Sequence, residues 1–144
     1  MQAQRLRNSD HCKAAAYQSE HGSTHGGNDT LVAGTATAGS TVVNDMWGDA
    51  QFMSASATAG RDTFVFKDNL AAGQTVGMHN TIEDFNQSQH DVIEFIGVAG
   101  VSSFGDLGIL VQAGATIITA GTDQVTLNNF TGTLTANDFL FAPA

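Results

Sequence analysis

The sequence predicts an all-β protein, built as a parallel β-solenoid with a β-rich C-terminal cap. The chain has 144 residues, of which 16 are Gly, only 13% are charged, and 9 are Phe. Such a composition, with frequent Thr, Val and Ile, favours strands and turns over helices. A short acidic pattern recurs through residues 25–95, and strand-like segments separated by Gly follow it. One domain with a single core is expected at this length.

Residues 1–25 are expected to form a flexible N-terminal arm. They contain three of the five basic residues and three of the five His. They show no strand alternation, and only a weak helical pattern from Cys12 to Glu20. With a single Cys, the chain can form no internal disulfide.

Residues 26–95 repeat one theme, an Asp or Asn followed two residues later by an apolar residue. Its first four copies are spaced by 16, 17 and 18 residues. That period suits a β-solenoid in which every coil contains two short strands and two turns. The apolar residues should then point inward and stack coil upon coil; for the first four copies they are Leu31, Trp47, Phe64 and Ile82.

The sequence of residues 96–144 predicts the β-rich C-terminal cap. The segments ILVQ (109–112), ATIIT (115–119) and QVTL (124–127) have strand character and are separated by Gly-containing turns. A helical turn is expected at Ser103–Leu107, capped by Ser102 or Ser103, and another at Thr135–Asp138.

The segments GGNDTLVAG (26–34) and AGRDTFVF (59–66) resemble the nonapeptide repeat of the RTX family, the haemolysin-type calcium-binding proteins. The resemblance implies a parallel β-roll with calcium bound between successive turns, through Asp carboxylates and the carbonyl groups of Gly-bearing turns. In the repeat G-G-x-G-x-D-x-U-x, Gly27 and Gly60 match the third Gly, while Asp29 and Asp62 match the Asp. Asp45 matches less well, and Asn80 replaces the next Asp, so fewer calcium ions than repeats are expected.

Two further segments extend the resemblance. EDFNQSQHDVIEF (83–95) is similar to the segment that closes an RTX roll, and its Asp84 and Asp91 flank a polar loop that can hold a further cation. TLNNFTGTLTANDFLFA (126–142) is similar to the uncleaved signal by which an ABC-type exporter recognises type I secretion substrates. A secreted, extracellular calcium-binding protein is therefore implied, with this expected set of metal-site residues: Gly27, Asp29, Asp45, Gly60, Asp62, Asp84 and Asp91.

Other functions are disfavoured by composition and motifs. A net charge of −9 with five Lys and Arg argues against nucleic-acid binding. No uninterrupted apolar run is long enough to predict a membrane span. Since the chain carries no recognisable catalytic motif, it is expected not to be an enzyme.

Three alternatives to the calcium-binding function remain open. The Asp residues can simply stabilise turns through backbone hydrogen bonds. The chain can be a carbohydrate-binding module of an enzyme that acts on extracellular polysaccharide, which exposed aromatic residues would favour. An enzyme would instead need His79 or His90 in contact with Asp84 or Asp91.

Overall fold

The computed structural model describes residues 11–15, 27–37, 42–49, 58–68, 74–76 and 79–144. Over these residues the protein is rich in strands, and its helical segments are short 3₁₀ turns, which confirms the all-β prediction. The elements are β1 (His11–Ala15), β2 (Thr30–Val32), β3 (Thr35–Thr37), β4 (Val43–Trp47), β5 (Thr63–Lys67), β6 (Gln74–Val76), β7 (His79–Ile82), η1 (Gln87–Gln89), β8 (Val92–Ile96), η2 (Phe104–Asp106), β9 (Leu107–Gln112), β10 (Ala115–Ala120), β11 (Asp123–Leu127), η3 (Ala136–Asp138) and β12 (Phe139–Ala142).

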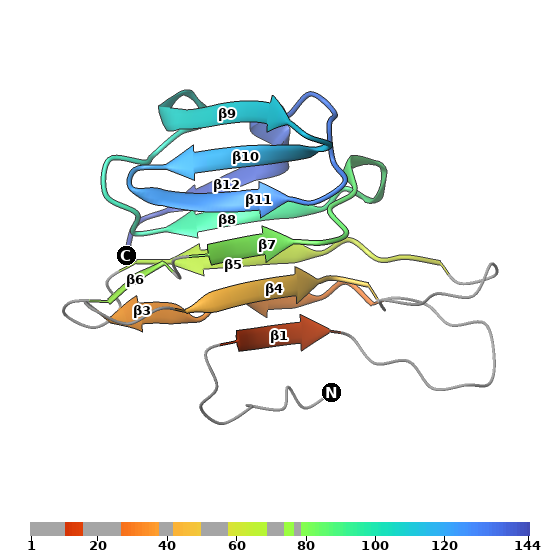
Figure 1. The fold of residues 1–144 in the computed structure, drawn as a ribbon, viewed down its shortest axis with the longest axis horizontal. Helices are drawn as coiled ribbons and strands as arrows, with labels where there is room; N and C mark the ends of the chain where they lie inside the picture. Colours follow the sequence, from red (N-terminus) through yellow and green to blue (C-terminus); the bar gives the residue numbers. More distant parts are fainter. Residues whose placement is uncertain (1–10, 16–26, 38–41, 50–57, 69–73, 77–78) are drawn as a thin grey trace.

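Two sheets lie one behind the other (Figure 1). The larger has six strands in the order β1-β4-β7-β11-β10-β9, and the other has four in the order β12-β8-β5-β2. All pairs in the four-stranded sheet are parallel. The six-stranded sheet is mixed, because β9, β10 and β11 pair antiparallel with one another while β11 pairs parallel with β7. A separate antiparallel pair is formed by β3 and β6.

Successive copies of the repeated theme alternate between the two sheets. Leu31 pairs with Phe64, and Phe64 with Ile93, in the four-stranded sheet. Ile82 lies in the other sheet, where it pairs with Met46. Each copy therefore contributes one strand, and two copies bring the chain back to the same sheet. The prediction that Leu31, Trp47, Phe64 and Ile82 form one inward stack is wrong, since the apolar residues form two facing rows.

Trp47 departs from its predicted position for a local reason. Along β4, burial alternates so that Asn44 and Met46 face the interior, whereas Trp47 is only half-buried. Since successive side chains of a strand point to opposite faces, Met46 takes the inward place expected for Trp47.

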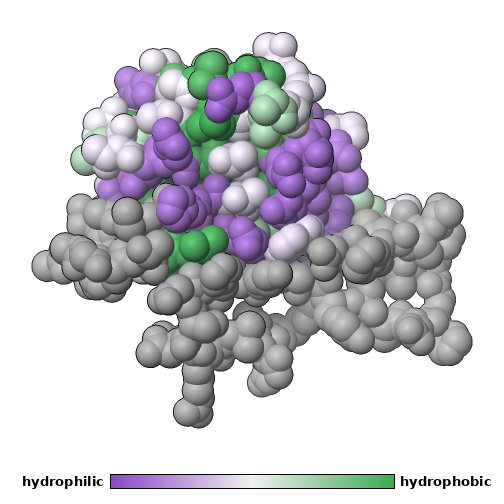
Figure 2. All heavy atoms as spheres, in the orientation of Figure 1, coloured by the Kyte–Doolittle hydropathy of each residue, from purple (hydrophilic) through white to green (hydrophobic). Residues whose placement is uncertain are grey.

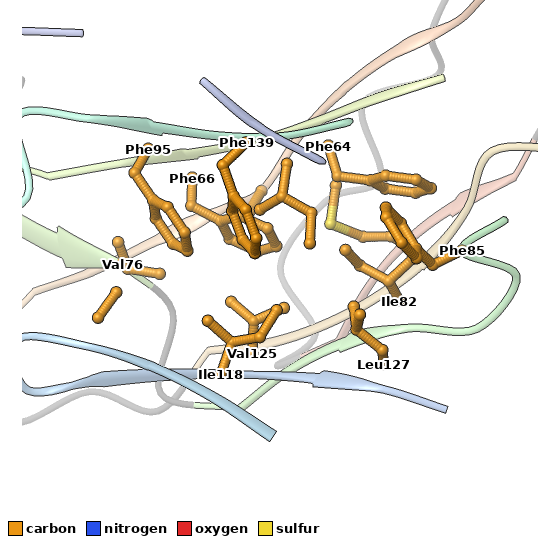
Figure 3. Close-up of a cluster of buried hydrophobic side chains, with 14 of the residues drawn as sticks. Phe64, Phe66, Val76, Ile82, Phe85, Phe95, Ile118, Val125, Leu127 and Phe139 are labelled. Atoms are coloured by element: carbon orange, nitrogen blue, oxygen red, sulfur yellow. The ribbon is translucent and has the colours of Figure 1, made fainter. Parts of the chain in front are cut away.

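The core lies between the sheets and is dominated by Phe (Figure 3). Phe64, Phe66 and Phe95 of the four-stranded sheet are almost completely buried. They face aliphatic residues of the other sheet, among them Ile82 and Ile118. Burying side chains of this size contributes about 1.5 to 3 kcal/mol each, so these rows account for much of the cohesion between the sheets.

The C-terminal region forms the strands and turns that its sequence predicts. The three strand-like segments lie in β9, β10 and β11. The predicted helical turns are η2 and η3, capped by Ser103 and Thr135 respectively. Between β9 and β10, Ala113 and Gly114 form a tight turn with positive φ at both residues.

The N-terminal prediction is corrected in part. His11–Ala15 form a strand, β1, that pairs in parallel with β4, where neither strand nor alternation was expected. Residues 1–10 and 16–25 lie outside the described residues. In the described part of the chain, no helix has the length and apolar character needed to cross a membrane.

Candidate functional site

Three aspartates stand in a row at one edge of the four-stranded sheet. Asp29, Asp62 and Asp91 each directly precede a strand of that sheet, β2, β5 and β8 respectively. The first paired positions of these strands are Thr30 with Thr63, and Thr63 with Val92. Parallel pairing therefore brings the three aspartates together, and we call them the aspartate row.

Two carboxylates of the aspartate row, those of Asp62 and Asp91, accept hydrogen bonds from the backbone of neighbouring turns. The backbone N–H of Asp29 donates to Asp62 Oδ1 at 2.9 Å. The N–H of Asp62 donates in turn to Asp91 Oδ1 at 2.9 Å, and that of Asn86 to Asp91 Oδ2 at 2.9 Å. The row is thus a chain of side-chain to backbone bonds that runs across the strands.

Two more aspartates reach the same edge from the six-stranded sheet. Asp49 follows β4, and Asp84 follows β7. Asp84 accepts backbone hydrogen bonds from Gly48 and Asp49, each at 2.9 Å, on its two oxygens. Asp49 Oδ1 accepts one from Gly60 at 3.2 Å. Together with the aspartate row, Asp49 and Asp84 make up what we call the acidic turn cluster.

The cluster gathers negative charge in a buried place. Asp62 and Asp91 are only 1% and 2% exposed. Burial, with Asp91, Asp49 and Asp29 as charged neighbours, raises the pKa of Asp62 to about 7 despite the hydrogen bond from Asp29. Burial likewise raises the pKa of Asp91 to about 6, with Asp84 and Asp49 adding to the effect.

Asp84 is affected in the same way, and the hydrogen bonds that the cluster accepts come from the backbone. Burial also raises the pKa of Asp84, with Asp49 as its like-charged neighbour. Among the described residues, four of the five carboxylates accept hydrogen bonds from backbone N–H groups, namely those of Asp49, Asp62, Asp84 and Asp91. Arg61, the basic residue beside Asp62 in the chain, donates its Nε to the carbonyl oxygen of His90 at 3.0 Å.

Glycines allow the turns to approach one another at this edge. A Cβ on Gly48 would overlap the Asp62 carboxylate, and one on Gly60 would overlap the carbonyl group of Gly27. The predicted glycines Gly27 and Gly60 therefore lie against each other, one in each of two adjacent turns. A larger residue at Gly48 or Gly60 would therefore push the turns apart.

Most of the predicted metal-site residues meet at this edge. Gly27, Asp29, Gly60, Asp62, Asp84 and Asp91 all do. Asp45 does not, because it is a half-buried residue in the middle of β4, paired with Thr81. Asp49 was missed, although the pair Gly48-Asp49 directly after a strand is itself a turn signal.

Asn80, expected as a weakened ligand position, belongs to the interior instead. It is 3% exposed and accepts a hydrogen bond from Asn44 Nδ2 at 2.7 Å. Its own Nδ2 donates to the carbonyl oxygen of Gln124 at 2.9 Å. Asn44 also exchanges two hydrogen bonds with the backbone of Gly34. The two asparagines thus link strands inside the protein.

The acidic turn cluster has the donor chemistry of a hard-cation site, since carboxylate oxygens are the ligands that calcium prefers. In the described residues, Asp49 Oδ2 and Asp62 Oδ2 accept no hydrogen bond, whereas both oxygens of Asp84 and Asp91 do. No group of three or more His, Cys, Asp or Glu within that same part of the chain has the spacing to hold a metal ion as it stands. Cation binding would therefore require some backbone hydrogen bonds of the cluster to be exchanged for metal ligation.

The two histidines considered for catalysis lie at the surface. His79 begins β7 and His90 ends the turn that contains η1, with φ 64°. Both are exposed. No hydrogen bond between either imidazole and an aspartate is found in the described part of the chain.

Comparisons of the chain with protein-family models, with characterised proteins and with solved structures find no match.

Proposed function

We propose that this protein is a secreted, non-catalytic calcium-binding module of RTX type. In this proposal calcium binds at the acidic turn cluster and stabilises the fold after export. The observation that carries the proposal is the burial of several carboxylates, from two successive turns, whose described hydrogen bonds come only from the backbone. Burial raises the pKa of Asp62 and of Asp91, and their charged neighbours add to the effect; a divalent cation would neutralise this buried charge.

The residues that would hold the ion come from both turns. Asp49 and Asp62 bound the passage from β4 to β5, and Asp84 and Asp91 bound the passage from β7 to β8. Bound calcium would supply electrostatic attraction between these passages where the carboxylates now repel one another. Because the native state would bind the ion and the unfolded chain would not, calcium would favour folding.

The strand arrangement supports the β-roll part of the proposal. Repeated units alternate between two sheets, and β2, β5, β8 and β12 are all parallel. On the other side β4, β7 and β11 are parallel as well, and the β9–β10–β11 hairpins close the end. We therefore propose a roll over residues 26–95, with residues 96–144 as its cap.

Calorimetric titration of the chelator-treated protein with calcium, with magnesium as the comparison ion, tests the function. We expect heat of binding and a rise in the free energy of unfolding of about 2.7 kcal/mol at a calcium concentration one hundred times the dissociation constant. Asp62→Asn combined with Asp84→Asn should abolish both effects. Asp45→Asn removes one similar charge from a half-buried position in mid-strand and should preserve them. If millimolar calcium produced no heat of binding and no stabilisation, the proposal would be refuted.

One observation favours a carbohydrate-binding module as the second candidate. Trp47 lies on the outward side of β4 and is half-buried, so an aromatic ring is not confined to the core. On this face Asn128 Nδ2 donates to Glu83 Oε2 at 2.6 Å, which shows polar groups near the ends of β7 and β11. Titration with soluble polysaccharides should then give binding that Trp47→Ala removes and Asp62→Asn does not.

A further inference from the structure

The end strand β9 exposes apolar side chains at the edge of the six-stranded sheet. It is the last strand in that sheet, next to β10 (Figure 1). Ile109, Leu110 and Val111 are 39%, 53% and 50% exposed. In Figure 2 hydrophobic residues gather at the end of the molecule where Figure 1 places β9. Exposed edge strands usually carry charged residues or Pro that prevent pairing, and LGILVQ has neither.

The backbone of β9 has a defined set of groups directed to the open side. Gln112 and Ala115 flank the two-residue turn, so they form the hydrogen-bonded pair that closes the hairpin. Hydrogen-bonded pairs then alternate along the ladder, through Leu110 and Gly108. The N–H and C=O groups of the intervening residues, Leu107, Ile109 and Val111, therefore point away from β10. Within the described residues, no strand pairs with them.

We propose that β9 pairs with β9 of a second copy of this chain, antiparallel and about a twofold axis at Ile109. Leu107 then lies opposite the partner's Val111, and Ile109 opposite the partner's Ile109. The three residues with free backbone groups would all be used, and the two six-stranded sheets would become one continuous sheet. Ile109 and Val111 lie on the same face as the buried Ile118 and Thr116 of β10, so the apolar interior face would continue across the dimer.

Side-chain size and charge fit a second copy in this alignment. Leu110, on the other face, lies opposite the partner's Gly108, which leaves room for its side chain. Asp106 comes opposite the partner's Gln112, an amide rather than a carboxylate. Residues 107–122 contain no charged side chain, although the chain has a net charge of −9. This is therefore a surface where two copies meet with little like-charge repulsion.

Sedimentation of the full chain over a range of concentrations tests the pairing. We expect reversible dimerisation, with the average mass rising from 15.0 kDa toward twice that value between about 1 μM and about 1 mM, because one strand pair buries less surface than a standard interface. Ile109→Lys should keep the protein monomeric with an unchanged circular dichroism spectrum. Val32→Lys, a similar change at the exposed edge strand β2, should leave dimerisation intact. Monomers throughout the range, or equal loss in both variants, would overturn the proposal.

Disulfide trapping tests the alignment itself. In a Cys12→Ser background, Ile109→Cys places a thiol opposite its own copy, at the separation of a hydrogen-bonded strand pair, about 5.5 Å between Cα atoms. Leu110→Cys places the two thiols on either side of the axis, where the Cα atoms exceed the limit of about 7 Å for a disulfide. We expect mild oxidation to give a covalent dimer for Ile109→Cys and not for Leu110→Cys. Equal crosslinking of both would show random collision and overturn the alignment; association through another surface would leave Ile109→Cys uncrosslinked.

Discussion

At the scale of single residues, the acidic turn cluster balances two opposing effects. Removing a carboxylate from water is unfavourable, and three like charges near Asp62 add repulsion. Against this, its Oδ1 accepts the N–H of Asp29, which would otherwise need another partner. The carboxyl group is therefore held with a raised pKa, and in the proposed function a cation would compete with the proton for the same place.

The pKa of Asp62 makes the stability of the metal-free protein depend on pH. Its native value of about 7 lies above its ordinary value of 3.8, so the native state binds the proton more tightly than the unfolded chain. The stabilisation from this proton is fully present below about pH 4 and is lost as the pH rises through about 7. We expect Asp62→Asn to be more stable than the unaltered chain at pH 8, by about 2 to 4 kcal/mol. The full pKa shift at about 1.4 kcal/mol per unit sets the upper limit, and solvent screening lowers it. Urea unfolding at several pH values in chelator measures this. If the free energies of unfolding of the two proteins differed by the same amount at every pH from 4 to 8, this prediction would be contradicted.

At the scale of elements, the sequence predicts where strands form better than how they are placed. The Asp-x-apolar theme locates β2, β5 and β8, and Gly-separated segments locate β9, β10 and β11. Which sheet each strand joins was predicted wrongly, because an inward apolar residue satisfies either of two facing sheets. Register within a strand was also ambiguous in β4, where both Met46 and Trp47 are apolar and only one can face inward.

The prediction of the metal-site residues from the sequence was limited in the same way. Asp45 follows the theme, with Trp47 two residues later, whereas Asp49 does not, because Gln51 stands at that place. The repeat alone therefore could not show that the turn begins after Trp47. The asparagine pair was missed because Asn80 occupied a position where the repeat has Asp. Local spacing thus predicted the acidic edge, while the pairing of distant strands determined which residues compose it.

Asn80 gives a prediction for the strands it joins. Its side chain accepts from Asn44 and donates to the carbonyl group of Gln124, in a place almost closed to water. Asn80→Ala leaves buried polar groups without their partner, at a cost of about 1 to 3 kcal/mol in the free energy of unfolding. Asn128→Ala removes an exposed hydrogen bond to Glu83 and should change stability by less than about 0.5 kcal/mol. Chemical denaturation compares them; equal effects would assign no special role to the interior pair.

At the scale of the whole molecule, charge and calcium are linked to the order of export and folding. A chain with net charge −9 and a buried acidic cluster repels itself when compact. In the proposed function, low cytosolic calcium would leave the chain loosely folded and able to pass through an exporter. Calcium outside the cell would then bind the native state and draw the folding equilibrium toward it.

The proposed export signal can be separated from the fold by two variants. Deleting Thr126–Ala144 removes part of β11 and all of β12, including the buried Phe139, so it disturbs folding as well as any signal. Phe95→Ala also destabilises the core, by about 3 to 5 kcal/mol, yet keeps the tail. In a host with an ABC-type exporter, we expect Phe95→Ala to reach the medium and the truncated chain to accumulate inside, with both synthesised equally. Immunoblots of cells and medium measure this. Because an exporter that threads unfolded chains does not require a stable fold, retention of the truncated chain alone would assign the signal to the tail, whereas its appearance in the medium would exclude one there.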